Sequence, residues 1–265
     1  MSLRVRKYRE EMQRSLRLEP ISEALPVTLV IARLVAIAFT IIAVKMFHFI
    51  KYRHYFDDLV TYHRENLTRK YVIGLLFFEM PLTTFPYNFT VALLAYKLIK
   101  RYNELIDGTV KAIESLAQLL NIETRQIYNT EVLESRKIPM APIVALLAYN
   151  AFLRFLILFP ILLYLDIKTA KGCNDVAKAI NKGASLVVER GANVVIVLEL
   201  TKLSRGEHPT LRISVGTAIL TLIANVVLSI PAAVRMHKII RRVNTTLRLC
   251  RYTVNSIASG LVTPL

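Results

Sequence analysis

A single carboxylate lies inside a run of apolar residues, in the sequence FFEMPLTTFPYNF at residues 77–89. Glu79 follows two phenylalanines, and Pro81, Pro86 and Asn88 come after it. An ionised carboxylate in apolar surroundings is costly unless it is protonated, paired or in contact with water. The two prolines remove backbone hydrogen bonds and predict a break in any helix here. Because transporters place their sites at broken membrane helices, Glu79 and Asn88 are candidates for an ion or proton path.

Other polar residues in apolar surroundings could pair with Glu79 or line the same path. Arg154 is the first candidate partner, and Arg33 is the second. Asn225 and Asn88 could form hydrogen bonds between helices. Two interpretations remain open. Either these groups fix the register of a helix bundle, or they line a pore or ion path around the break at Pro81 and Pro86.

The sequence contains no motif for catalysis or for binding a cofactor. It has no nucleophile elbow, zinc-protease helix, phosphate-binding loop or Cys-x-x-Cys pair. Cys173 and Cys250 are the only cysteines, and they lie far apart in sequence. His48 and His237 could supply haem ligands from two helix ends, but interfacial or solvated histidines are the simpler interpretation. We therefore expect a protein that is not an enzyme and that binds no metal or other cofactor.

Apolar residues make up 54% of the 265 residues and collect in four blocks flanked by Lys or Arg. The blocks are residues 27–50, 71–99, 139–166 and 210–234. Each is longer than the ~20 residues needed to cross the hydrocarbon core of a bilayer. The pattern predicts an all-α polytopic membrane protein, a single domain of residues 1–265 with about four transmembrane helices. The second helix would be broken by its prolines and be either kinked or re-entrant. A large soluble helical protein is the alternative, although core helices are rarely so long and apolar.

Amphipathic patterns continue into the polar segments between the blocks. In residues 100–138, 170–203 and 235–260, apolar or small residues recur at spacings of three and four, which is typical of a helix-packing seam. The seam residues are Ile106, Val110, Ile113, Ala117 and Leu120; Val176, Ile180, Gly183, Val187, Gly191, Val194 and Leu198; and Ile240, Val243, Leu247, Cys250, Val254 and Ile257. We expect long helices that extend beyond the membrane and pack against one another there.

The net charge of +16 identifies candidate partners. Residues 235–260 form a predicted basic amphipathic helix, and its polar face carries Arg241, Arg242, Arg248 and Arg251. Such a surface binds anionic lipid headgroups or packs against a partner protein. Nucleic acid requires the same electrostatics, although no nucleic-acid motif accompanies the arginines.

Four crossings would place the N-terminus, residues 100–138 and the C-terminus on one side of the membrane. Residues 51–70 and 167–212 would lie on the other side. The first side carries more Lys and Arg, which favours a cytoplasmic N-terminus in the plasma membrane. The absence of Trp and the abundance of Ile and Leu are also typical of thermophile proteins.

These features favour a non-enzymatic membrane subunit in a pore, translocation or envelope complex, as a homo- or hetero-oligomer in the lipid bilayer. The seam-bearing helices offer more contact surface than four membrane helices require, and a polyanion such as DNA is a candidate cargo. The alternative is a small-solute or ion transporter that uses the broken helix around Glu79 and Asn88.

Overall fold

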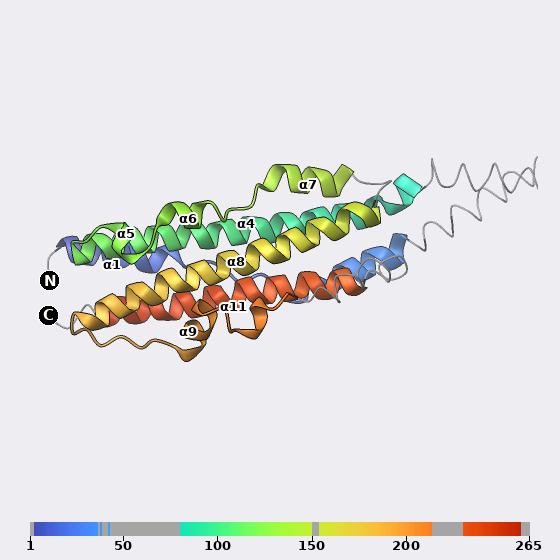
Figure 1. Ribbon diagram of the computed structural model, residues 1–265. Helices are drawn as coiled ribbons and strands as arrows, with labels where there is room; N and C mark the ends of the chain where they lie inside the picture. Colours follow the sequence, from blue (N-terminus) through green and yellow to red (C-terminus); the bar gives the residue numbers. More distant parts are fainter. Residues whose placement is uncertain are drawn as a thin grey trace, which may run out of the picture.

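The computed structural model describes residues 3–36, 38, 42, 80–149, 154–213 and 230–260, and this part of the chain is all-α. Its helices align along one axis and form an elongated bundle (Figure 1). Both chain termini lie at the same end of this bundle. The predicted helical bundle is confirmed.

Three long helices form the body of the bundle, and all three run in the same direction (Figure 1). They are α4 (Met80–Leu120), α8 (Arg154–Glu189) and α11 (Ile230–Gly260). All three end near the chain termini, so the chain must return along the bundle after α4 and again after α8. The far end of the bundle, where these helices begin, exposes large apolar side chains, and we call it the apolar end.

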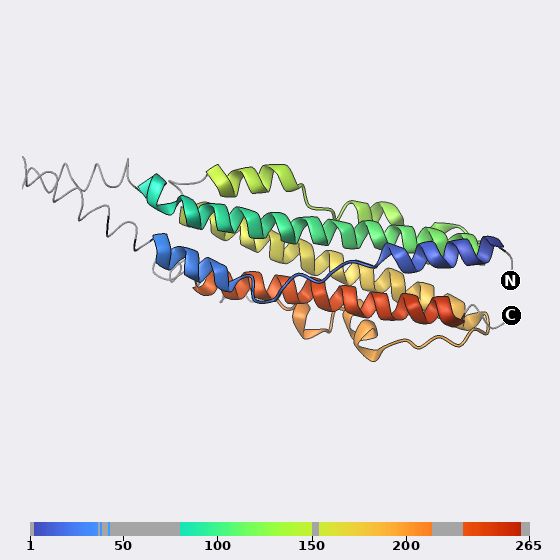
Figure 2. The same cartoon turned by 180° about the vertical axis from the view of Figure 1, so that it is seen from behind.

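The return segments and the N-terminal segment cover the sides of the three long helices. Figure 2 shows α1 beside α4, with an extended linker that then follows α11. The elements of these segments, in chain order, are α1 (Leu3–Ser15), the linker 17–26, a helix over residues 27–36, α5 (Thr124–Ile127), α6 (Thr130–Glu134), α7 (Met140–Tyr149), α9 (Leu198–Ser204) and the 3-10 helix η2 (Pro209–Leu211).

The predicted seams are the buried faces of the long helices. Every seam residue from Ile106 to Leu120 on α4 and from Ile240 to Val254 and Ile257 on α11 is buried. The seam on α8 is confirmed only as far as Val187, because the helix ends at Glu189. Gly191 then has a φ of 87°, which favours glycine and turns the chain out of the helix.

Side-chain contacts fix the positions of α4 and α8 along the bundle axis, which we call their heights. The Tyr102 hydroxyl donates hydrogen bonds to the carbonyl oxygens of Arg136 and Lys168, at 3.2 and 3.1 Å. The hydroxyl fits there because Gly172 has no side chain, and a Cβ at that position would overlap Tyr102 Oη. Since both helices rise about 1.5 Å per residue in the same direction, Tyr96 is level with about Tyr164.

The structure corrects one topological prediction. Residues 100–138 and 167–212 lie in one bundle, where Arg136 Nε is 2.7 Å from Asp175 Oδ2. A membrane cannot separate segments in such contact, so the arrangement that places them on opposite sides is wrong. The physical reason is that α7 runs towards the apolar end and α8 runs back from it, so both segments lie along the same bundle (Figure 1).

Much of the four apolar blocks falls outside the described residues. Within the ranges that the structure describes, none of the helices combines the length and the hydropathy needed to cross a bilayer.

Candidate functional site: a buried arginine–aspartate cluster

Asp166 on α8 is buried between two arginines of α11. Its Oδ2 accepts hydrogen bonds from Arg235 Nε and Nη2, both at 3.2 Å. Its Oδ1 lies 2.7 Å from Arg242 Nη1. The side chains of Asp166, Arg235 and Arg242 are only 8%, 5% and 1% exposed. We call these three residues the arginine–aspartate cluster.

Arg242 is the most connected member of the cluster. Its Nη1 also donates to the backbone oxygen of Asp166 at 2.8 Å and to Thr169 Oγ1 at 3.0 Å. Its Nε donates to the backbone oxygen of Thr210 at 2.6 Å. One guanidinium therefore joins α8, α11 and the return segment at η2.

The cluster holds two positive charges for one negative charge. Arg235 Nη1 is buried and forms no hydrogen bond within the described part of the chain. A buried charge with too few partners is costly, whereas a paired one is tolerated. The cluster therefore depends on Asp166, the only acidic side chain bonded to either arginine in the described ranges.

The cluster lies near the boundary between apolar and polar surfaces. Towards the apolar end, each helix presents large apolar side chains outward. The exposed residues there are Val27, Ile31, Leu34, Val35 and Ile42; Phe89, Leu93 and Tyr96; Leu146; Tyr164; and Ile230 and Val234. Away from that end the outward positions of the long helices are mainly charged or polar.

The thiols beside the cluster are buried and protonated. Cys173 and Cys250 are both free and fully buried. Burial raises the pKa of the Cys173 thiol to about 11, although Thr246 and Arg242 act in the opposite direction. Burial, with Cys173 nearby, also raises the pKa of Cys250. Neither thiol is therefore a nucleophile at neutral pH.

A second polar cluster attaches the segment before α7 to α8. Arg136 pairs with Asp175, and Lys178 Nζ lies 3.9 Å from the other carboxylate oxygen. Burial, followed by the effect of Asp175, raises the pKa of Tyr128 to about 12. These ion pairs hold the segment before α7 against α8, and each charged group has an opposite charge beside it.

The sequence-predicted pore residues are only partly described. Glu79 and Asn225 lie outside the described residues, as does the side chain of Arg154, the first residue of α8. Asn88 is buried in α4. Arg33 is placed over the ring of Tyr87, with its Cζ 5.6 Å from the ring centroid. The structure therefore does not test the proposed pairing of Glu79 with Arg154 or Arg33.

The predicted helix break is not seen within α4. Its backbone is helical from Met80 through Pro81 and Pro86. Pro81 lies in the first turn, where its missing N–H costs no hydrogen bond within the helix, and the helix continues past Pro86 despite the loss of one such bond.

The basic surface predicted on α11 requires one correction. Arg241, Arg248 and Arg251 are exposed, but Arg242 is among the most buried side chains of the protein. Its position lies next to the seam residue Val243, and the partner that holds it is Asp166. Sequence reasoning missed the arginine–aspartate cluster. The available signal was Asp166 itself, an acidic residue at the end of the third apolar block.

The geometry of the cluster does not suggest a reaction. Nε and Nη2 of Arg235 and Nε and Nη1 of Arg242 bond to Asp166, Thr169 or backbone oxygens, and Asp166 is held between the two arginines. Among the described residues, no group of three or more His, Cys, Asp or Glu side chains could hold a metal ion. The arrangement joins helices and fixes their heights.

Comparisons with known protein families, with curated proteins and with solved structures found no match.

Proposed function

We propose that this protein is a non-enzymatic membrane subunit whose helical bundle stands on one face of the membrane as an assembly scaffold. One observation carries the proposal. Every helix that reaches the apolar end turns large apolar side chains outward there, including Leu93, Val234 and Ile31, where a water-soluble protein would place polar residues.

The one-sided bundle limits how the apolar blocks can enter a bilayer. α7 has 10 residues and reaches about 15 Å, and the apolar start of α8 reaches about 18 Å. A hydrocarbon core is about 30 Å thick. We therefore propose that residues 139–166 enter one leaflet and return, while residues 27–50 and 71–99 are long enough to cross as a pair. This replaces the expectation of four full crossings.

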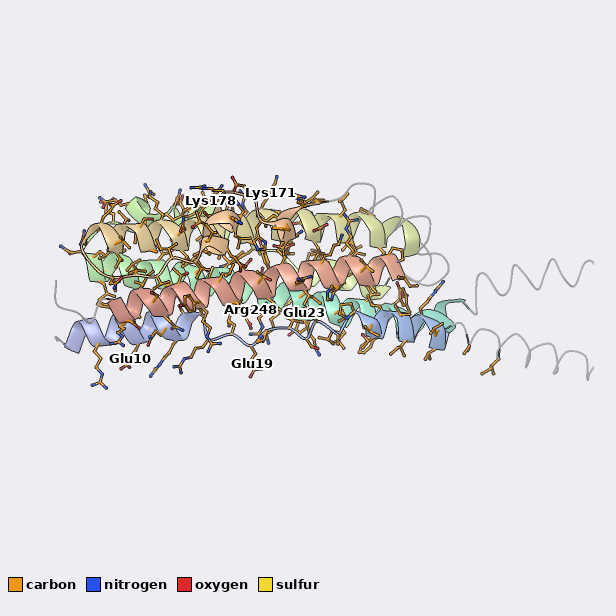
Figure 3. All side chains as sticks on the ribbon, turned by 90° about the horizontal axis from the view of Figure 1, so that it is seen from below. Glu10, Glu19, Glu23, Lys171, Lys178 and Arg248 are labelled. Atoms are coloured by element: carbon orange, nitrogen blue, oxygen red, sulfur yellow. The ribbon has the colours of Figure 1, made fainter. Side chains whose placement is uncertain are left out.

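A scaffold function agrees with the surface of the remaining bundle. Figure 3 shows Lys171 and Lys178 on one flank, Glu10 and Glu19 on the opposite flank, and Arg248 and Glu23 between them. Such a long, charged, rigid surface suits contacts with other subunits, as homo- or hetero-oligomer, in a pore, translocation or envelope complex. The excess of Lys and Arg favours a cytoplasmic bundle in the plasma membrane.

The proposal is tested by extraction and by mass. The protein should remain in the membrane pellet after alkaline carbonate treatment, and in mild detergent it should elute with a mass greater than one chain. Release into the supernatant would exclude the membrane anchor. A single chain with no bound subunit, after extraction from its own cells, would exclude the scaffold.

Passage or docking of a polyanion such as DNA is a further part of this proposal, supported by the net charge of +16. Phosphate contacts make such binding weaker as salt rises. Binding that is weak and unaffected by salt would exclude it.

The alternative is a small-solute or ion transporter that uses Glu79 and Asn88. A transporter should be stabilised by its solute, and Glu79→Gln should alter the pH dependence of transport. A scaffold would show neither effect.

A further inference from the structure

The boundary of the apolar end lies at the same height on three helices. On α4 the exposed side chains change from apolar to basic between Tyr96 and Lys97. On α8 the same change occurs between Tyr164 and Lys168. These two tyrosines are level with one another, as the contact of Tyr102 with Lys168 requires. Both are 37% exposed, at the position where interfacial tyrosines mark the edge of a bilayer.

The boundary on α11 falls at this height too. Asp166 on α8 contacts Arg235 and Arg242, so the midpoint of these two arginines is level with Asp166. The last exposed apolar residue of α11 before this midpoint is Val234, and the first exposed cation is Lys238. His237 Nδ1 is 3.0 Å from Glu23 O, which places the turn just before the helix 27–36 near this height as well.

Of the basic side chains that follow this boundary within about two helical turns, six are not buried and form no ion pair among the described residues. We call them the basic ring. They are Lys97 and Lys100 on α4, Lys168 and Lys171 on α8, and Lys238 and Arg241 on α11.

The basic ring has little opposite charge around it. Within the described residues, none of its six members forms an ion pair. Asp166 is at this height but is buried and engaged with Arg235 and Arg242. Glu23 is the one exposed carboxylate at this height in the described part. Arg101, at this height on α4, is not counted in the ring because it pairs with Glu104 at 2.9 Å. Farther from the boundary, Lys137 is 2.7 Å from Asp107.

We propose that the basic ring binds the headgroups of anionic lipids and so sets the height at which the bundle stands on the membrane. The proposal rests on the membrane anchorage proposed above. Apolar side chains on one side of the ring would lie among the acyl chains. The long lysine side chains can place their ammonium groups at the phosphates of the adjacent leaflet.

The test measures stabilisation by lipid of the full chain purified in a neutral detergent. Phosphatidylglycerol, phosphatidylcholine and inorganic phosphate are added separately, and the melting temperature is recorded. A ring variant replaces all six basic residues by Gln. A control variant removes the same charge at exposed positions away from the boundary, by substituting Lys111, Lys182, Lys202, Arg205, Arg248 and Arg251 with Gln.

We expect phosphatidylglycerol to raise the melting temperature of the wild type and of the control variant by at least about 3 °C. Phosphatidylcholine should have no such effect, and the ring variant should respond to neither lipid. An equal response of ring variant and control would overturn the proposal. An equal effect of inorganic phosphate would show an ion site and overturn the lipid assignment.

Two further comparisons keep the test decisive. If the ring variant does not fold, Lys97→Gln with Lys238→Gln is compared with Lys111→Gln with Lys182→Gln, and the first pair should show the smaller response. Carbonate extraction distinguishes the two proposals, since a protein that stays in the pellet but shows no lipid preference refutes the basic ring alone.

Discussion

Arg242 and Arg248 lie two turns apart on α11 and illustrate how burial decides the role of an arginine. Arg242→Gln removes the donor to Thr210, Thr169 and Asp166. We expect a loss of about 3–5 kcal/mol, the typical cost of breaking a buried ion pair. Arg248→Gln, at an exposed position, should change stability by less than about 0.5 kcal/mol. Thermal unfolding of both variants in neutral detergent measures the difference, and similar melting temperatures would contradict it.

Gly172 is required by its close approach to Tyr102. In Gly172→Ala the new methyl group would overlap Tyr102 Oη and lie 2.8 Å from Cζ. Overpacking of this kind costs about 1–3 kcal/mol. Tyr102→Phe removes the hydroxyl, and so part of the overlap. The double variant should therefore lose less stability than the sum of the single variants, which a double-mutant cycle by thermal unfolding measures. Additive losses would show that the two residues do not interact.

At the scale of elements, asparagine side chains attach extended segments to the long helices. Asn244 on α11 accepts from Ile21 N at 2.9 Å and donates to Ile21 O at 2.7 Å, which fixes the linker 17–26. Asn103 on α4 forms the same pair of bonds with Ile138, both at 2.9 Å. The asparagine side chain thus supplies the donor and the acceptor that a neighbouring strand would supply to an extended segment in a sheet.

Asn244→Ala should release the linker without unfolding the bundle. It removes two hydrogen bonds, worth about 1–3 kcal/mol together, and leaves two buried backbone groups unpaired. We expect trypsin to cleave after Arg17 faster than in the wild type, with little change in helical content. Asn255→Ala, at an exposed position on the same helix, is the control. Equal cleavage of both variants would show that Asn244 does not hold the linker.

The sequence predicted helices better than it predicted their arrangement. Spacing alone identified the buried faces of α4 and α11, because helix packing repeats at three and four residues. Spacing could not show where α8 ends, since Gly191 and Val194 continue the pattern after the helix has stopped. It also placed Arg242 on the surface, because the burial of an arginine depends on a partner 76 residues away, Asp166.

For the whole molecule, the parallel direction of α4, α8 and α11 has one consequence. Parallel neighbours need a return segment, and the described parts of both returns, residues 121–149 and 190–213, lie along the bundle. Under the membrane anchorage proposed above, an apolar block between two such helices would enter and leave the membrane on the same side. The contact between Arg136 and Asp175 therefore excludes an arrangement in which the apolar block between them, residues 139–166, makes a single crossing.

This topology is tested by labelling in sealed membrane vesicles. Gln118→Cys, Lys182→Cys and Arg251→Cys place exposed thiols on α4, α8 and α11. A membrane-impermeant maleimide should label all three from the same side. Alternating crossings would instead place Lys182→Cys on the side opposite to Gln118→Cys. The native thiols give little background near neutral pH, because Cys173 is fully buried and burial raises its pKa to about 11. Labelling of Lys182→Cys from the other side alone would refute the one-sided bundle and the proposed return of residues 139–166.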